Sequence, residues 1–159
     1  MEFKASYGLM TKIVTAAIAL LFTGLIVFGA GSSESSRTAY GAIFLIMVFG
    51  ICLILSPRGY SVTKDELLIH RLIGNVHIKK ADIKSVATLE KDDVRYAIRT
   101  FGVGGLFGYY GKFYNSRFGH MTWYMTRSDR PVLITTVKGK KIVLSPDEVG
   151  SFTAAFQPV

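Results

Sequence analysis

Residues 13–30 read IVTAAIALLFTGLIVFGA and residues 40–55 read YGAIFLIMVFGICLIL, with no charged side chain in either stretch. As helices that rise 1.5 Å per residue, they are about 27 Å and about 24 Å long, against a hydrocarbon thickness of about 30 Å. The second stretch therefore needs one flanking residue on each side. A helix satisfies its own backbone hydrogen bonds inside a bilayer. The sequence predicts transmembrane helices at residues 13–30 and 39–56, joined by an external turn at residues 31–38, GSSESSRT.

Two other interpretations of the first stretch are a cleaved signal peptide and one half of a buried helical pair. A signal peptide has an apolar core of about 7–15 residues, whereas this stretch has 18 and a second one follows directly. Nothing downstream offers a helical bundle in which the pair would be buried. The membrane hairpin is therefore the favoured interpretation.

The orientation of the hairpin follows from the basic residues beside its helices. Four of them lie on the side of the chain termini: Lys4, Lys12, Arg58 and Lys64. The connecting turn contains Arg37 alone. Because Lys and Arg accumulate on the cytoplasmic side of a membrane, we expect both termini in the cytoplasm. Residues 1–12 are then a cytoplasmic N-terminal segment, and we expect a multi-pass protein of the inner (cytoplasmic) membrane.

Most of the positive charge lies in the remaining chain. Residues 57–159 contain 16 Lys and Arg against 9 Asp and Glu, whereas the whole chain has a net charge of +8. A basic domain beside a bilayer is attracted to anionic lipid by roughly 1 kcal/mol per well-placed cation. Nucleic acid or an acidic protein would attract it as well. The single cysteine, Cys52, excludes a disulfide within the chain and a cysteine-based zinc site.

From residue 58 onward, alternating apolar residues and turn signals predict a β-rich domain. Seven strands are expected, at residues 59–62, 66–72, 76–80, 83–89, 121–126, 132–137 and 140–144. Gly74-Asn75 is typical of a tight turn between two of them. Near the end of the chain, Ser145 followed by Pro146 and Glu148 predicts a helix start. The apolar residues that follow, Val149, Phe152 and Phe156, would pack on the strands.

The order of four strands, three strands and a closing helix resembles a pleckstrin-homology (PH) fold. The stretch GVGGLFGYYGKFYN, followed by MTWYMT, PVLITT and KKIVLSPDE, is similar to bacterial PH-like domain proteins in particular. The resemblance implies that residues 57–159 form a cytoplasmic PH-like domain of about seven antiparallel strands, a partly open barrel with a C-terminal capping helix. It implies a membrane-associated module and no catalytic residue. The first hairpin turn, residues 63–66, has two acids beside one Lys, which argues against specific inositol phosphate binding.

A glycine- and aromatic-rich insert at about residues 91–119 is the main candidate interaction segment. Its residues 101–119 hold six glycines and seven aromatic residues. Either the rings contact the membrane interface or a protein partner, or they fill the barrel mouth while the glycines shape turns. Candidate interface residues are Phe107, Tyr109, Tyr110, Lys112, Phe113, Tyr114 and Arg117. A nucleotide-binding loop is disfavoured, because the spacing of Gly102, Gly104, Gly105 and Gly108 lacks the βαβ context.

A second candidate surface is a basic rim at strand ends and turns. Its members are Lys79, Lys80, Lys84, Lys138, Lys140 and Lys141. They would face anionic lipid, or they serve solubility alone, since lysines are common at edges. Nucleic acid is not expected, because the sequence contains no recognition helix or RNP-like motif.

Metal binding and catalysis have little support in the sequence. His70 and His77 would share one face of the predicted hairpin diagonally, but further ligands are missing, so no metal and no cofactor are expected. HExxH, GxSxG and Walker motifs are absent. We expect a non-enzymatic, membrane-anchored PH-like module that binds a protein partner or assembles with itself. The alternatives are a reader of anionic lipid headgroups and an accessory subunit of a membrane enzyme or transporter.

Overall fold

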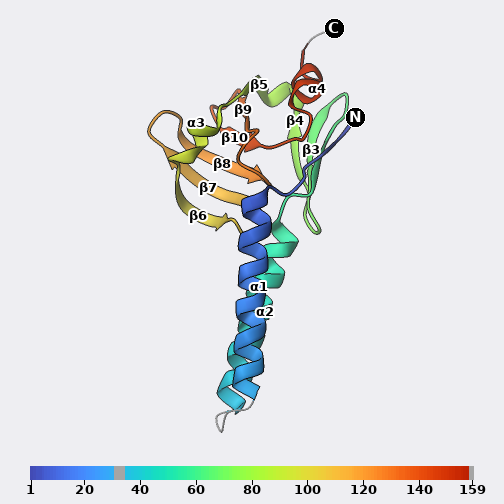
Figure 1. Cartoon of the computed structure of the whole chain (residues 1–159). Coiled ribbons are helices and arrows are strands. Elements are labelled where there is room, and N and C mark those ends of the chain that lie inside the picture. Colours follow the sequence, from blue (N-terminus) through green and yellow to red (C-terminus); the bar gives the residue numbers. More distant parts are fainter. Residues whose placement is uncertain (31–34, 158–159) are drawn as a thin grey trace.

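The computed structural model describes residues 1–30 and 35–157 of the chain (Figure 1). Its helices are α1 (Leu9–Ala30), α2 (Ser35–Leu55), α3 (Lys91–Arg95) and α4 (Val149–Ala154), with a 3-10 turn η1 (Lys80–Asp82). Its strands are β1 (Glu2–Lys4), β2 (Gly59–Val62), β3 (Glu66–His70), β4 (Val76–Lys79), β5 (Ile83–Thr88), β6 (Ile98–Gly104), β7 (Tyr109–Asn115), β8 (Gly119–Met125), β9 (Val132–Thr136) and β10 (Lys141–Leu144). Two long helices project from one side of a domain made of the strands and the short helices (Figure 1).

The long helices α1 and α2 lie side by side (Figure 1). Residues Leu9–Gly29 of α1 are long enough and apolar enough to cross a membrane, and the most apolar 18-residue window of this helix contains no buried residue. In α2 the apolar segment Ala39–Leu55 is shorter. One helix of the pair thus meets the requirements for a membrane span by itself.

Both helices begin earlier than the apolar stretches predict. α1 starts four residues before residue 13, in a turn closed by the Lys12 N–H, which donates to the Gly8 carbonyl at 3.1 Å. α2 starts at Ser35 and includes the second half of the predicted turn at residues 31–38. Residues 31–34 of that turn lie outside the described residues.

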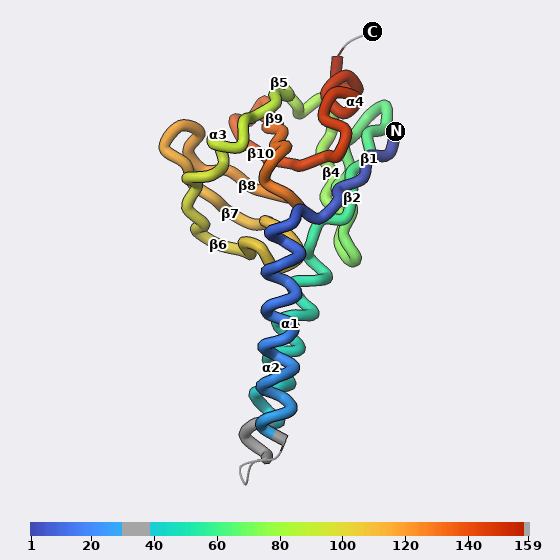
Figure 2. Tube along the Cα trace, in the orientation of Figure 1, coloured from blue at the N-terminus to red at the C-terminus, as the bar shows by residue number. Residues whose placement is uncertain are grey.

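The N-terminal residues pack on the domain, a contact that the sequence does not predict. β1 pairs antiparallel with β2, and Phe3 lies opposite Tyr60 (Figure 2). The Met1 amino group donates to the Val62 carbonyl at 2.9 Å, and the Phe3 ring lies 5.2 Å from that of Phe152. The two long helices are therefore inserted between two neighbouring strands of one sheet.

The strands form two sheets, with the orders β1-β2-β3-β4 and β5-β9-β10-β8-β7-β6. All seven predicted strands are found, and the expected C-terminal helix packs on them. β1, β6 and β7 are additional, so the described residues contain ten strands rather than seven. The prediction that all strands are antiparallel is also wrong, because β8 and β10 run parallel.

The insert at residues 91–119 folds as α3, β6 and β7 rather than as a loop. Gly102 and Gly111 pair across β6 and β7, with φ angles of 122° and 125°. A Cβ atom on Gly111 would lie 2.3 Å from the carbonyl oxygen of Phe101. Only glycine allows the two backbones to approach this closely, so these glycines serve strand pairing.

The connection between β3 and β4 is longer than the predicted two-residue turn. β3 ends at His70 and β4 begins at Val76, so residues 71–75 form the connection. His70 therefore lies beside β2, where its Nε2 is 2.6 Å from a serine hydroxyl. His77 instead has its Nδ1 3.0 Å from Glu66. Leu68 lies opposite His77, so the two histidines share one sheet face diagonally as predicted, but each has its own neighbour.

The helix start predicted at Ser145 is also wrong, because α4 begins at Val149. Ser145 is fully buried, and its hydroxyl accepts a hydrogen bond from the Thr126 N–H at 2.9 Å. Asp147 binds the N-terminal segment instead of capping the helix. Tertiary contacts thus occupy the side chains that would have capped the helix one turn earlier. Phe152 points into the core, as the helical spacing predicts.

The six-stranded sheet buries apolar residues on both faces. One core lies between the two sheets and α4: Phe3, Tyr60, Val62, Leu67, Ile69, Ile78, Val132, Ile134, Ile142, Leu144 and Phe152. The other lies on the outer face beneath α3: Val94, Phe113, Met121, Trp123, Met125, Leu133 and Val143. Because successive strand residues point to opposite faces, neighbouring residues of β7 and β8 belong to different surfaces.

Candidate interaction surfaces of the domain

The tip of the β6–β7 hairpin contacts both long helices. The Phe107 N–H donates to Thr15 Oγ1 of α1 at 3.0 Å, and the Phe107 ring centroid lies 4.8 Å from that of Phe49 of α2. Phe107 has a φ of 55°, which bulky residues rarely adopt. A Cβ atom on Gly105 would lie 3.1 Å from the side chain of Val14. The hairpin tip is therefore fitted closely to the helix pair.

Tyr110 binds the end of α2 from the same hairpin. Its hydroxyl donates to the Cys52 carbonyl at 2.5 Å. The last four carbonyls of a helix have no partner within the helix, and Cys52 is one of these four residues in α2. Burial raises the pKa of the Tyr110 phenol, and the neighbouring Cys52 adds to the rise. The phenol therefore stays protonated and remains a donor.

The first turn of α1 is bound to the end of β8. Thr11 is buried, and its hydroxyl donates to the Thr126 carbonyl at 2.8 Å, which also accepts the Gly8 N–H at 3.2 Å. The Thr126 hydroxyl donates to the Ser6 carbonyl at 2.9 Å. α1 and α2 are thus each held by separate parts of the six-stranded sheet.

An ionic cluster fixes the segment before α1. Arg127 forms two 2.6 Å hydrogen bonds to Asp129 and one of 3.3 Å to Asp147. Asp147 also accepts the Ser6 hydroxyl at 2.5 Å. Partial burial acts to raise the pKa of Asp147, but the bonds from Ser6 and Arg127 outweigh it and lower that pKa. The hydrogen bond from Arg127 likewise lowers the pKa of Asp129.

The predicted interface residues of the insert divide between different environments. Phe107 and Tyr110 contact the helices, while Phe113 is buried and stacks on Trp123 at 3.9 Å. Tyr109 is half-buried beneath α3. The three others are more exposed: Lys112 donates to Thr122, Tyr114 lies against His120, and Arg117 pairs with Asp93. The two interpretations of the insert therefore apply to different residues of it.

The predicted basic rim is split in two. Lys138, Lys140 and Lys141 line one cavity of about 320 Å³ together with Lys112 of β7. His120 and Thr122 lie between them, and no acidic residue lines this cavity. We call it the lysine pocket. Lys141 also donates to the Phe118 carbonyl at 2.5 Å.

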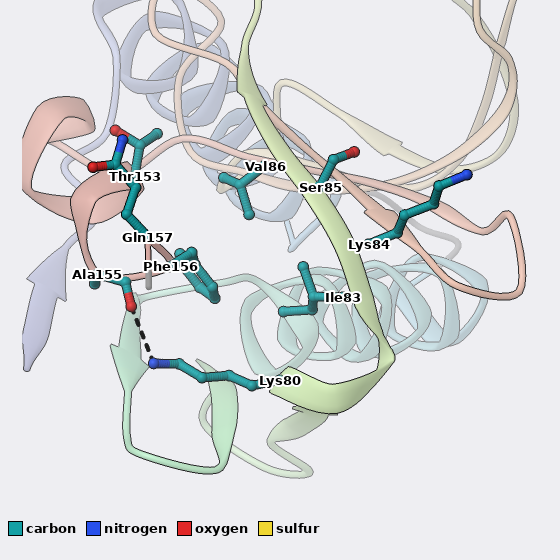
Figure 3. Close-up of a pocket in the computed structure, with 9 residues that line it drawn as sticks. All are labelled: Lys80, Ile83, Lys84, Ser85, Val86, Thr153, Ala155, Phe156 and Gln157. Atoms are coloured by element: carbon teal, nitrogen blue, oxygen red, sulfur yellow. Dashed lines mark hydrogen bonds between the residues drawn. The ribbon is translucent and has the colours of Figure 1, made fainter. Parts of the chain in front are cut away.

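The other part of the rim lies where β5 meets the end of α4. Lys80 and Lys84 line a cavity of about 380 Å³ beside Phe156 (Figure 3). The Lys80 ammonium donates to the Ala155 carbonyl at 3.0 Å, whereas Lys84 points away from Phe156 (Figure 3). Lys80 thus has a structural role in holding the end of the chain. Lys79 is exposed and lines neither cavity.

Exposed apolar side chains flank the helix pair on two sides. Leu72 and Ile73 lie in the β3–β4 connection, and Ile98 and Phe101 lie on β6; both elements are at the helix side of the domain (Figure 1). Ile73, Ile98 and Phe101 are 65%, 68% and 78% exposed. Sequence reasoning missed all four. The apolar pair Leu72-Ile73 directly before Gly74 was the available signal, because a hairpin connection in solvent is normally polar.

Comparison with known proteins gives one match. The family described as a bacterial PH domain matches residues 58–158. Neither the curated proteins nor the solved structures gave a significant match. The matched range includes every strand except β1 and excludes both long helices.

Proposed function

The chain belongs to the bacterial PH domain family, and from this membership we propose that it is a non-catalytic binding module, held by two transmembrane helices at the inner surface of a bacterial membrane, whose β6 edge binds a protein. A PH-like domain suggests a protein- or lipid-binding module in general. Membrane anchoring is supported by the apolar length of α1 and by the packing of α2 along it.

The contacts between the domain and the helices support a position of the domain directly at the membrane surface. Thr15 and Phe49 are the helix residues that the Phe107 tip contacts, and the last charge of α1 is Lys12. The hydrocarbon region would begin close to that level. The exposed apolar residues of β6 and of the β3–β4 connection then reach the interface, where apolar side chains are favoured.

The unpaired edge of β6 is the observation that carries the proposal of protein binding. β6 pairs with β7 on one side and ends the six-stranded sheet on the other. Soluble proteins usually protect such an edge with charges, bulges or a covering element. β6 has one register shift, between Arg99 and Phe101, and one charged residue, Arg99, but it is seven residues long and exposes Ile98 and Phe101. An extended segment of a membrane-bound partner or of a second copy can add to this edge by backbone hydrogen bonds.

Site-specific photo-crosslinking in cells tests the protein-binding proposal. Phe101 is replaced by p-benzoylphenylalanine, and Val137, which is also exposed but lies in the β9–β10 turn, serves as the matched control. We expect a protein adduct at position 101 and none at 137. An adduct of twice the chain mass identifies self-assembly, and another mass identifies a different partner. Equal yields at both positions, or lipid adducts alone at position 101, would contradict the proposal.

Anionic headgroup binding is a second candidate, favoured by the lysine pocket. Four lysines share this cavity without a lining acid, so their mutual repulsion would be relieved by a bound anion. Ligands that bind only the folded state raise its stability in proportion to ln(1 + [L]/Kd). We therefore expect phosphatidylglycerol in nanodiscs to raise the unfolding temperature, and salt to reduce the rise.

The matched variants separate this effect from general attraction to the bilayer. Lys138→Gln with Lys140→Gln should remove most of the rise in unfolding temperature. Lys79→Gln with Lys64→Gln makes the same charge change outside the pocket and should retain it. If the two double variants reduce the rise in unfolding temperature equally, the lysine pocket has no special role in lipid binding.

A further inference from the structure

A groove with a volume of about 820 Å³ lies beneath α3, beside the outer core. Ligand sites for small molecules usually have about 300–1,000 Å³. Three aromatic rings form its floor, Tyr109 and Phe113 of β7 and Trp123 of β8. Phe113 and Trp123 lie parallel, 3.9 Å apart with an interplanar angle of 7°. The two rings therefore stack face to face on each other, on the sheet face opposite the lysine pocket.

The indole of Trp123 has an unsatisfied donor. The side chain is only 4% exposed, and its Nε1 has no hydrogen-bond partner within the described part of the chain. Buried tryptophan N–H groups usually find an acceptor, because an unpaired donor is costly. The hydroxyls of Tyr109 and Ser128 also line the groove, but neither accepts from the indole among the described residues, so an oxygen of a ligand would supply the missing acceptor.

The rim of the groove is cationic. Lys91 and Arg95 of α3 and Arg99 of β6 line it, against the single acid Asp92. Asp92 lies 3.8 Å from Arg95, and both side chains are largely exposed, so this contact neutralises little. Lys91 and Arg99 take part in no ion pair among the described residues. Arginine is well suited to bind carboxylate or phosphate through two parallel hydrogen bonds.

We propose that this groove binds a small anionic ligand, a phosphate or carboxylate carried on a flat or apolar body. The aromatic floor of the groove receives the body, Arg95 and Arg99 bind the anionic group, and an oxygen of the ligand accepts the Trp123 N–H. The rim side chains are exposed and can rearrange around the ligand. The site is independent of protein binding at the outward edge of β6 and of the lysine pocket. The ligand is either a soluble molecule or the headgroup region of an anionic lipid.

Trp123 is the single tryptophan of the 159-residue chain, so its fluorescence reports on the groove directly. The full-length protein in nanodiscs of zwitterionic phosphatidylcholine is titrated with phenyl phosphate, with benzyl alcohol as an uncharged control. A second arm replaces part of the phosphatidylcholine by phosphatidylglycerol without any soluble probe. We expect a saturable change in emission with phenyl phosphate or with phosphatidylglycerol, and none with benzyl alcohol.

Two variants with equal charge changes decide the location. The double variant Arg95→Gln with Arg99→Gln alters exposed residues only. It should raise the ligand concentration needed for half-saturation at least about tenfold, which corresponds to the loss of one charge-assisted hydrogen bond. Lys138→Gln with Lys140→Gln should leave the response unchanged. A response to phenyl phosphate identifies a soluble ligand, and a response to phosphatidylglycerol alone identifies a lipid. No saturable response in either arm, or equal effects of both variants, would overturn the proposal.

Discussion

At the level of single residues, the β6–β7 hairpin depends on glycines where two backbones nearly touch. Replacing Gly111 by alanine places a Cβ atom 2.3 Å from the Phe101 carbonyl oxygen at a φ of 125°. Left-handed strain and overpacking each cost about 1–3 kcal/mol. We expect Gly111→Ala to lower the free energy of unfolding by about 2–5 kcal/mol, measured by thermal or denaturant unfolding in detergent.

Gly119→Ala is the matched control for this prediction. Gly119 also has a positive φ, of 71°, but a Cβ atom there would meet no atom within 4 Å. The control therefore measures the cost of the backbone conformation alone, about 1–2 kcal/mol. Equal losses from the two variants would mean that the strands separate easily and that the close approach is unimportant.

Asp147 gives a prediction about pH. Its folded-state pKa is lowered from 3.8, because the bonds from Ser6 and Arg127 outweigh partial burial. The stabilisation by the carboxylate is therefore fully present above the unfolded-state pKa and is lost as the pH falls through the folded-state pKa. We expect Asp147→Asn to cost about 1–2 kcal/mol at pH 7 and the difference from the wild type to shrink as the pH falls below the unfolded-state pKa of 3.8.

Thermal unfolding between pH 7 and pH 3 measures this difference. Glu148→Gln removes a neighbouring acid that is exposed and has no ion pair among the described residues. It should leave the unfolding temperature within experimental error at every pH. A loss for Asp147→Asn that stays constant from pH 7 to pH 3 would indicate a steric effect rather than a loss of charge.

At the level of elements, the Tyr110 hydroxyl links the domain to α2. Tyr110→Phe removes the donor to the Cys52 carbonyl and leaves a carbonyl at the helix end unpaired. We expect a loss of about 1–2 kcal/mol in the free energy of unfolding. Faster backbone hydrogen exchange in the last turn of α2 would locate the effect. Tyr114→Phe, which removes a partly exposed hydroxyl without a hydrogen bond in the described structure, should change neither quantity.

The elements that the sequence predicts correctly are those with a regular local pattern. The apolar runs predict α1 and α2, and alternation predicts β2 to β5 and β8 to β10. β6 and β7 escape prediction because five glycines between positions 102 and 111 interrupt the alternation. β1 has only three residues, and its partner strand follows more than fifty residues later. A pattern search cannot detect a pairing of that kind.

The candidate site follows the same division between local and distant causes. The aromatic content of the insert predicts that Phe107 and Tyr110 take part in an interface. Their partners, Phe49 and Cys52, lie far away in the sequence, so only the fold reveals that this interface is with the helices. Ser145 illustrates the opposite error. Its local pattern predicts a helix cap, but its hydroxyl instead accepts a hydrogen bond from the Thr126 N–H at the end of β8.

At the level of the whole molecule, the helices and the domain are parts of one folded unit. α1 is bound through Thr11 and Thr15, and α2 through Phe49 and Cys52. These contacts lie on both helices and on separate strands, so a rotation of the domain about the helix pair would break several at once. A partner at β6 would therefore meet the domain in one fixed orientation relative to the helix pair.

The insertion of the helices between β1 and β2 leads to a prediction about truncation. A fragment of residues 57–159 lacks β1, which buries Phe3 against Phe152 and pairs with β2. We expect this fragment to unfold without a cooperative transition, measured by circular dichroism during heating. Because Lys4 lies opposite Gly59, a short connection suffices to join the strands. A variant in which four Gly and Ser residues link Ser6 to Pro57 keeps β1 and should unfold cooperatively. If the fragment without β1 unfolded at the same temperature as the linked variant, the N-terminal strand would add nothing to the stability of the domain. The domain would then fold independently of the residues that precede it.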